Sequence, residues 1–328
     1  MTPASPAAPS SPSAAPNSVR RAVLDVGTNS VKLLVADLAP PTVRPVLERS
    51  IQTRLGRGLA TTGRLDPAAV AETVRVIARL HAEARQLGAE RVRIAATSAA
   101  REASNTGDLL DAVRTATGLV VEVLSGEQEA RWGFAGVTTD PDLQDRSILL
   151  LDVGGGSTEL ALGRVGNLRF HASYPLGAVR WLERLHPSDP PRPSELERGR
   201  RELAETVGSL VVPPLQPHLV GVRQGPLQLV GTGGTASVLA AMALELVAFD
   251  RAAIDGRVLR AAEVTARLEQ LWSLPLARRR VLPGLPPERA DVMLTGTLIY
   301  EGLMAVLGFE SLRITTRGLR YAALCDVA

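Results

Sequence analysis

The stretch ILLLDVGGGSTELAL, residues 148–162, decides the fold of this 328-residue chain. Its four leading apolar residues run into Asp152, which is typical of a buried strand that ends in a carboxylate. Three glycines follow at 154–156, and glycines let successive backbone N–H groups converge on an anion. A second apolar segment begins at Leu160, so we expect a hairpin whose tip binds phosphate. An ordinary glycine-rich turn is the alternative.

The N-terminal stretch AVLDVGTNSVKLLVA, residues 22–36, repeats this pattern. Asp25 is followed five residues later by Ser30, as Asp152 is followed by Ser157, and each loop lies between two apolar segments. Two copies in corresponding contexts indicate an internal duplication. Facing loops would hold a polyphosphate from both sides, and nearby carboxylates suit a divalent cation. The duplication therefore favours a functional loop over an ordinary turn.

Composition excludes several classes of protein. The net charge of +3 is too balanced to indicate a nucleic-acid-binding protein. Cys325 is the single cysteine, which excludes an intramolecular disulfide and a cysteine zinc site. No apolar run approaches the roughly 20 residues of a membrane span. Residues 1–18 are rich in Pro, Ala and Ser and lack a secretion signal, so we expect a disordered tail on a cytoplasmic protein without a membrane partner.

The remaining pattern predicts two α/β domains, residues 19–138 and 139–315, with a final helix at about 316–328 that packs back on the first. The first domain has the order β-β-α-β-α-β, with a loop at Ser50–Leu59 that carries Arg54 and Arg57. Ser125 and Gln128 predict a capping box at the start of a helix that continues to about Val137. A strand at residues 227–230 runs into a third glycine-rich segment, residues 231–234. It resembles a dinucleotide motif but lacks a convincingly placed acidic partner.

Five ordered motifs carry a resemblance to a known family: DVGTNS (25–30), ATSAAREA (96–103), LSGEQEAR (124–131), LDVGGGSTEL (151–160) and GTGGTA (231–236). Together they resemble the exopolyphosphatase and guanosine pentaphosphate phosphohydrolase (Ppx/GppA) family, from about Ala22 onward. The weaker stretches YPLGAVR (174–180) and LPGLPPERADV (282–292) are also similar to that family. The resemblance implies two duplicated actin-like, ribonuclease-H-like domains with a cleft between them. It also implies hydrolysis of the terminal phosphate of inorganic polyphosphate or pppGpp with Mg²⁺, or alternatively Mn²⁺.

The resemblance also implies roles for single residues. Glu129 would be the general base that activates water. Asp152 and Glu159 would serve the metal and the water, with Asp25 as a further candidate ligand. The expected phosphate-binding residues are Gly27, Thr28, Asn29, Ser30, Lys32, Arg101, Gly154, Gly155, Gly156, Ser157, Thr158, Gly231, Thr232 and Gly233.

Each role has a structural alternative. Glu129 would otherwise be a solvent-facing residue of a capped helix, and Asp152 and Asp25 would bond only to their turns. Arg101 could pair with Glu102 or Asp108 on the surface, and Lys32 could face solvent. Thr232 and Gly233 would contact either phosphate or a neighbouring loop.

Two features depart from the family pattern. Gln128 stands where many members have a glutamate, but Gln caps a helix as well as Glu does. The chain ends at Ala328, so we expect the extra C-terminal domain of longer relatives to be absent, which puts dimerisation through that domain and grip on long chains in doubt. A monomer or a homodimer is expected.

Three classes of function follow. The leading hypothesis is a magnesium-dependent exopolyphosphatase, with pppGpp hydrolysis as the runner-up. A kinase of the same fold would transfer the phosphoryl group to a second substrate. A non-catalytic phosphate sensor or actin-like assembly protein would bind without releasing phosphate.

Overall fold

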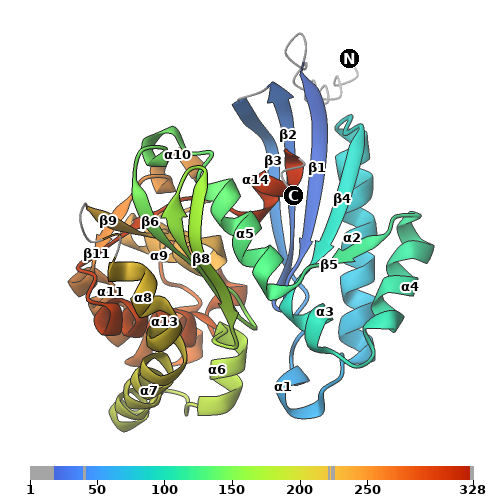
Figure 1. Ribbon diagram of the computed structural model, residues 1–328. Helices are drawn as coiled ribbons and strands as arrows, with labels where there is room; N and C mark the ends of the chain where they lie inside the picture. The colour runs from blue at the N-terminus through green and yellow to red at the C-terminus, as the bar shows by residue number, and fades with distance from the viewer. Residues whose placement is uncertain (1–17, 40–41, 221, 223–225, 326–328) are drawn as a thin grey trace, which may run out of the picture.

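The computed structural model describes residues 18–39, 42–220, 222 and 226–325. The chain forms two α/β halves, each with one mixed sheet and helices packed against it (Figure 1). The predicted disordered tail lies outside these ranges except for Ser18, as do residues 326–328 of the predicted final helix. The predicted domain boundary near residue 139 stays a prediction.

The first half is built on five strands. Its elements are β1 (Val19–Val26), β2 (Ser30–Ala39), β3 (Thr42–Gln52), α1 (Leu59–Thr62), α2 (Pro67–Gln86), β4 (Arg91–Ala96), α3 (Ser98–Glu102), α4 (Thr106–Thr117), β5 (Val121–Val123) and α5 (Gly126–Val137). The strand order is β3-β2-β1-β4-β5. Strands β1, β2 and β3 are antiparallel, whereas β4 and β5 run parallel to β1.

The second half repeats this topology. Its elements are η1 (Pro141–Leu143), β6 (Ser147–Val153), β7 (Thr158–Arg164), β8 (Asn167–Tyr174), α6 (Ala178–Leu185), α7 (Pro193–Thr206), η2 (Val207–Val211), α8 (Val212–Val220), β9 (Leu227–Thr232), α9 (Gly233–Ala243), α10 (Arg251–Ile254), β10 (Val258–Arg260), α11 (Ala261–Trp272), α12 (Leu276–Arg279), η3 (Pro287–Arg289), α13 (Met293–Leu307), β11 (Ser311–Ile314) and α14 (Leu319–Leu324). The run β8-β7-β6-β9-β11 matches β3-β2-β1-β4-β5 in order and direction, and β10 adds an antiparallel edge. The repeated topology confirms the predicted duplication and the α/β class.

The predicted β-β-α-β-α-β order is wrong by one strand, because β3 follows β2 and takes in residues 50–52 of the predicted loop. This strand is the edge of its sheet and is only partly buried. It carries Pro45 and charged residues at 44, 48 and 49, which edge strands tolerate and central strands do not. Its counterpart β8 was missed for the same reason, since an edge strand has no continuous apolar run.

Helix α5 lies between the two sheets and carries one of the predicted catalytic residues (Figure 1). The predicted capping box is confirmed: the N–H of Gln128 donates to Ser125 Oγ at 3.1 Å, and the N–H of Ser125 donates to Gln128 Oε1 at 2.8 Å. Trp132 packs with side chains of the first sheet, whereas Phe134 packs with side chains of the second. The helix is therefore fixed by both halves.

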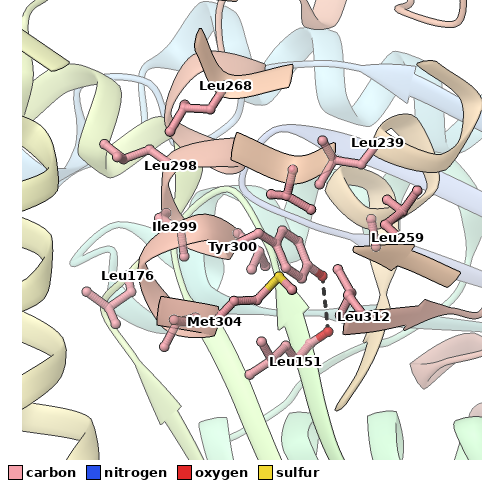
Figure 2. Close-up of a cluster of buried hydrophobic side chains, with 14 of the residues drawn as sticks. Leu151, Leu176, Leu239, Leu259, Leu268, Leu298, Ile299, Tyr300, Met304 and Leu312 are labelled. Atoms are coloured by element: carbon pink, nitrogen blue, oxygen red, sulfur yellow. Dashed lines mark hydrogen bonds between the residues drawn. The ribbon is translucent and has the colours of Figure 1, made fainter. Parts of the chain in front are cut away.

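Tyr300 links the hydrophobic core of the second half to two strands of its sheet. It lies at the centre of a large hydrophobic cluster and is fully buried on α13 (Figure 2). Its hydroxyl donates toward the carbonyl oxygens of Leu151 and Thr232, each at 3.2 Å. Leu151 lies two residues before the end of β6 and Thr232 is the last residue of β9, so the core of this half fixes the carboxyl ends of both strands.

After β11 of the second sheet, the chain crosses to the first half, where helix α14 packs on the first sheet. Leu319, Tyr321 and Leu324 join a buried cluster with Val23 of β1 and Leu34 of β2. Among the helices of the described ranges, none combines the length and the apolar character needed to cross a membrane.

Candidate active site

The two predicted loops adopt the same turn. The N–H of Gly27 donates to the Ser30 carbonyl at 3.0 Å, and the N–H of Gly154 donates to the Ser157 carbonyl at 2.9 Å. Each turn joins the first two antiparallel strands of its sheet. Equal spacing from aspartate to serine has thus produced equal backbone geometry.

The loops face each other at close range. A Cβ atom built on Gly155 would lie 3.1 Å from Thr28 Cβ and 3.2 Å from Asn29 Cβ. A Cβ atom on Gly156 would lie 2.6 Å from Thr28 Oγ1. A Cβ atom at either position would force the Thr28 or Asn29 side chain to shift, so the glycines of one loop make room for the polar side chains of the other.

Helix α6 fixes the orientation of the second loop. The N–H of Ala178 donates to the Gly154 carbonyl at 2.9 Å, and the N–H of Val179 donates to the Gly155 carbonyl at 2.8 Å. Arg180 Nε donates to the next carbonyl, at position 156, at 3.0 Å. A loop whose carbonyl oxygens are satisfied on one side can present N–H groups to an anion on the other.

A cavity of about 60 Å³ lies between the loops. The structure brings to it thirteen of the residues predicted from sequence: Asp25, Gly27, Thr28, Asn29, Ser30, Lys32, Glu129, Asp152, Gly154, Gly155, Gly156, Ser157 and Glu159. These residues come from both halves of the chain, so neither half forms the site alone. We refer to this space as the phosphate cavity.

Two predicted phosphate contacts point away from it. The Thr158 hydroxyl donates to the Leu176 carbonyl and is completely buried. Gly231 packs against the Tyr300 ring and Leu312. Both residues follow the two-residue alternation of a strand, which sends successive side chains to opposite faces.

Thr232 and Gly233 line a second, adjoining space of about 360 Å³, which we call the side cavity. The Thr232 hydroxyl donates to the Arg317 carbonyl, so it contacts a neighbouring loop. Gly233 has φ 82°, and a Cβ atom there would collide with the Asp152 carboxylate. The two cavities share six lining residues: Asp25, Lys32, Asp152, Gly234, Arg289 and Leu319.

Arg101 does not line the phosphate cavity but holds Glu129. Its Nη1 donates to Glu129 Oε2 at 3.0 Å and to the Leu124 carbonyl at 2.9 Å. Burial raises the pKa of Glu129 well above its usual value, nearby Glu159 adds to the rise, and Arg101 opposes it. A carboxylate of raised pKa suits a general base at neutral pH.

The other carboxylates stand in register on the second sheet. Asp152 on β6 is the cross-strand partner of Glu159 on β7. Burial and the charge of Asp152 raise the pKa of Glu159 to about 7, while hydroxyls of Ser157 and Ser173 oppose the rise. Burial also raises the pKa of Asp152, and Lys32 opposes that rise. Such clustered, perturbed carboxyl groups are typical of functional sites.

Asp25 lines the phosphate cavity from the first half, as Glu129 does, and it pairs with Lys32, whose Nζ lies 3.6 Å from Asp25 Oδ2. The two residues are cross-strand partners on β1 and β2. Lys32 therefore does not simply face solvent, and its charge lies between the two cavities that it lines.

Arg289, Thr97 and Ser98 line the phosphate cavity but were not predicted as site residues. Arg289 Nε is buried and has no hydrogen-bond partner among the described residues. A half-buried guanidinium whose Nε lacks a partner, beside a phosphate cavity, is suited to bind an oxyanion. The signal lay in the weaker stretch at 282–292, and Thr97 and Ser98 lie within the motif at 96–103.

The donor set fits a magnesium ion that binds together with phosphate. The described residues contain no group of three or more His, Cys, Asp or Glu side chains that could hold a metal by themselves. Asp25, Asp152 and Glu159 nevertheless line one cavity, and all offer oxygen. Magnesium commonly takes one or two carboxylates and completes its shell with water and substrate phosphate oxygens.

Residues 34–327 match the Ppx/GppA phosphatase family. The chain belongs to that family. This Ppx/GppA protein is 35% identical over 300 residues to exopolyphosphatase 2 of Mycobacterium tuberculosis, over 87% of this chain and 89% of that protein. It is 30% identical over 306 residues to exopolyphosphatase 1 of Mycobacterium bovis, over 92% and 86% of the two chains.

Solved structures agree with this membership. A Ppx/GppA family member of Aquifex aeolicus has a TM-score of 0.75 and 29% identity, over 94% of this chain and 97% of that one. An exopolyphosphatase of Cytophaga hutchinsonii has a TM-score of 0.83 over 94% and 97%, and at 24% identity it shows the fold alone. The expected duplicated α/β fold is confirmed. This Ppx/GppA protein is a phosphoanhydride hydrolase, and its family is generally dependent on a divalent metal.

Proposed function

We propose that this protein is a magnesium-dependent exopolyphosphatase, which removes the terminal phosphate of inorganic polyphosphate with a water molecule activated by Glu129. The phosphate cavity supports this proposal best, because two facing glycine loops enclose about 60 Å³ beside a buried carboxylate. A space of this size suits the end of a chain. The names of the related exopolyphosphatases support the same substrate.

In this proposal Glu129 receives a proton from the attacking water. The water oxygen forms a bond to the terminal phosphorus, and the bond from that phosphorus to the bridging oxygen breaks. The shortened chain leaves with the electron pair on that oxygen, and orthophosphate is the second product. Catalysis of this kind depends mostly on positioning and on charge stabilisation.

Other residues place the reacting groups. The N–H groups of the two loops and the Arg289 guanidinium would bind the terminal phosphoryl oxygens, since all of them line the phosphate cavity. Arg101 would keep the Glu129 carboxylate in place through the 3.0 Å bond. Asp152 and Glu159, with Asp25, would hold Mg²⁺ or alternatively Mn²⁺. The bound ion would neutralise charge on the phosphate oxygens.

A phosphate-release assay tests the proposal. The purified full chain is incubated with polyphosphate of several lengths, pppGpp or ATP, with Mg²⁺, Mn²⁺ or EDTA. We expect orthophosphate from polyphosphate with Mg²⁺ and none with EDTA. No release from any polyphosphate would refute the proposal. ATP turnover only with an added acceptor would indicate a kinase, and nucleotide-dependent polymerisation without phosphate release would indicate an assembly protein.

The side cavity favours pppGpp as a second candidate substrate. Inorganic polyphosphate has no apolar group to pack against apolar side chains. This cavity nevertheless includes Val238, Phe249 and Pro286. Phe249 is 57% exposed and so is available to stack on a base. A guanosine group could lie there while its phosphates enter the adjoining phosphate cavity. A kcat/KM for pppGpp above that of every polyphosphate would promote this candidate. Equal loss of both activities in Phe249→Ala would contradict it.

A further inference from the structure

Ser173 lies in a row of polar residues that crosses the second sheet. In the strand register, Asp152 on β6 is opposite Glu159 on β7, and Glu159 is opposite Ser173 on β8. Residues directly opposite on neighbouring strands project from the same face of a sheet. The two carboxylates and this hydroxyl therefore point the same way.

The hydroxyl of Ser173 selects one oxygen of Glu159. Ser173 Oγ donates to Glu159 Oε1 at 2.8 Å, and Ser157 Oγ donates to the same oxygen at 2.7 Å. Among the described residues, none donates a hydrogen bond to Glu159 Oε2. Glu159 is 3% exposed and lines the phosphate cavity. With Oε1 held by two hydroxyls, Oε2 is the oxygen left for a ligand.

Ser173 also touches the helix that carries Glu129. Gly126 is the first residue of α5, and a Cβ atom built on it would lie 2.6 Å from Ser173 Cβ and 3.1 Å from Ser173 Oγ. Glu129 lies one helical turn further on. The Ser173 side chain thus bonds to Glu159 of the second half and contacts the start of the helix that carries Glu129.

We propose that Ser173 is a positioning residue, which orients Glu159 through Oε1 and sets the distance between Glu159 and the start of α5. It is not among the residues that line the phosphate cavity, so it would act through Glu159 and α5. The inference rests on the proposed hydrolysis of polyphosphate. Partners that orient catalytic or ligating groups typically contribute about 10–100-fold to activity.

The test compares Ser173→Ala with Ser188→Ala. Ser188 Oγ donates to Glu195 Oε2 at 2.7 Å, so its variant loses a like serine–glutamate bond at a position that lines neither cavity. We expect kcat for polyphosphate to fall about 10–100-fold in Ser173→Ala with KM changed less than about threefold. Ser188→Ala should keep kcat within about twofold. Melting temperatures of both variants show whether a fall in kcat results from loss of folded protein.

A double-mutant cycle separates positioning from general support of the fold. In a Glu159→Ala background the oxygen that Ser173 orients is gone, so adding Ser173→Ala should change kcat less than about twofold. Single-turnover phosphate release at high enzyme concentration keeps the weak background measurable. An unchanged kcat in Ser173→Ala, or full additivity with Glu159→Ala, would overturn the inference. A wild-type protein without phosphate release would instead refute the proposed function.

Discussion

Arg101 and Glu129 form an ion pair at the edge of the phosphate cavity, with 3.0 Å between Nη1 and Oε2. The same nitrogen donates to the Leu124 carbonyl at 2.9 Å, which ties the pair to the end of β5. The surface partners considered from sequence are not used, since Glu102 pairs with Arg180 instead. The arginine expected to bind phosphate thus holds the proposed base.

Replacing Glu129 with glutamine tests the base directly. The change keeps the size of the side chain and leaves the Ser125–Gln128 capping box intact. We expect kcat to fall by about 10²–10⁴, with KM within a few-fold, because a base acts on the chemical step. Glu127→Gln is the matched control, since Glu127 lies exposed in the same helical turn and should keep wild-type rates. More than about a tenth of wild-type kcat in Glu129→Gln would exclude this base.

The pH dependence of kcat/KM should follow Glu129. A base works when deprotonated, so activity should fall as the pH drops through its pKa. Burial raises that pKa well above 4.5, so the acid limb should lie above the usual glutamate range. Arg101 opposes the rise, so Arg101→Met should move the acid limb to still higher pH. Arg131→Met, an exposed change on the same helix, should leave it in place. A limb that stays fixed or moves to lower pH in Arg101→Met would contradict the assignment.

Glu159 should destabilise the folded state at high pH. Its pKa is about 7 in the folded state against an ordinary 4.5, so the folded state binds more protons between these values. Stability therefore falls as pH rises through this window. Glu159→Gln should gain on the order of 1–3 kcal/mol over wild type at pH 8, but not at pH 4.

A glutamate of opposite shift provides the control for that measurement. Arg192 and Ser188 lower the pKa of Glu195 to about 2, so Glu195 stabilises the folded state above its unfolded pKa. Glu195→Gln should therefore lower the melting temperature at pH 8. If both variants change stability in the same direction at pH 8, burial does not control the pKa of Glu159.

Gly177→Ala should disturb the second phosphate loop. A Cβ atom at Gly177 would overlap the backbone of Gly155 and Gly156, which cannot move aside cheaply. We expect KM for polyphosphate to rise at least about tenfold, because a small displacement of a binding loop has large effects. Gly107→Ala is the control, since a Cβ atom there meets nothing within 4 Å. Wild-type KM in Gly177→Ala would show that the loop tolerates displacement.

Dependence on chain length and salt tests the grip outside the phosphate cavity. Two cations near the site are already paired: Arg54 Nη1, on the loop at 50–59, lies 2.5 Å from Asp291 Oδ2, and Lys32 Nζ, on the wall of both cavities, lies 3.6 Å from Asp25 Oδ2. Affinity should therefore level off at short or medium chains. Added salt should raise KM more than it lowers kcat, because exposed charges are screened over about 8–10 Å. Affinity that keeps rising into chains of hundreds of phosphates would contradict this prediction.

The loops could be predicted from the sequence because their chemistry is local. Asp25 and Asp152 end apolar strands, and a fixed spacing to a serine sets the turn. Thr158 and Gly231 were misplaced because a motif includes residues of both faces. Strand alternation places Glu159 toward the cavity and Thr158 away from it.

Arg289 could not be predicted in the same way. It lies far along the chain from both loops and reaches the phosphate cavity only because η3 packs beside Gly234 of α9. The pairing of Arg101 with Glu129 likewise depends on where α3 meets α5. Tertiary packing decides such contacts: the stretch at 282–292 marks Arg289 only as part of a weak family resemblance, and its spacing does not place the side chain beside the loops.

The return of α14 to the first sheet has a consequence for biosynthesis. One face of β1 and β2 is covered by Leu319, Tyr321 and Leu324, about three hundred residues later in the chain. The second sheet, in contrast, draws its strands from residues 147–314 without interruption. A growing polypeptide would therefore expose an apolar face of its first sheet until residues 319–324 have been synthesised. We expect the half made first to be the last to finish folding, and chaperones that bind nascent chains to act on it.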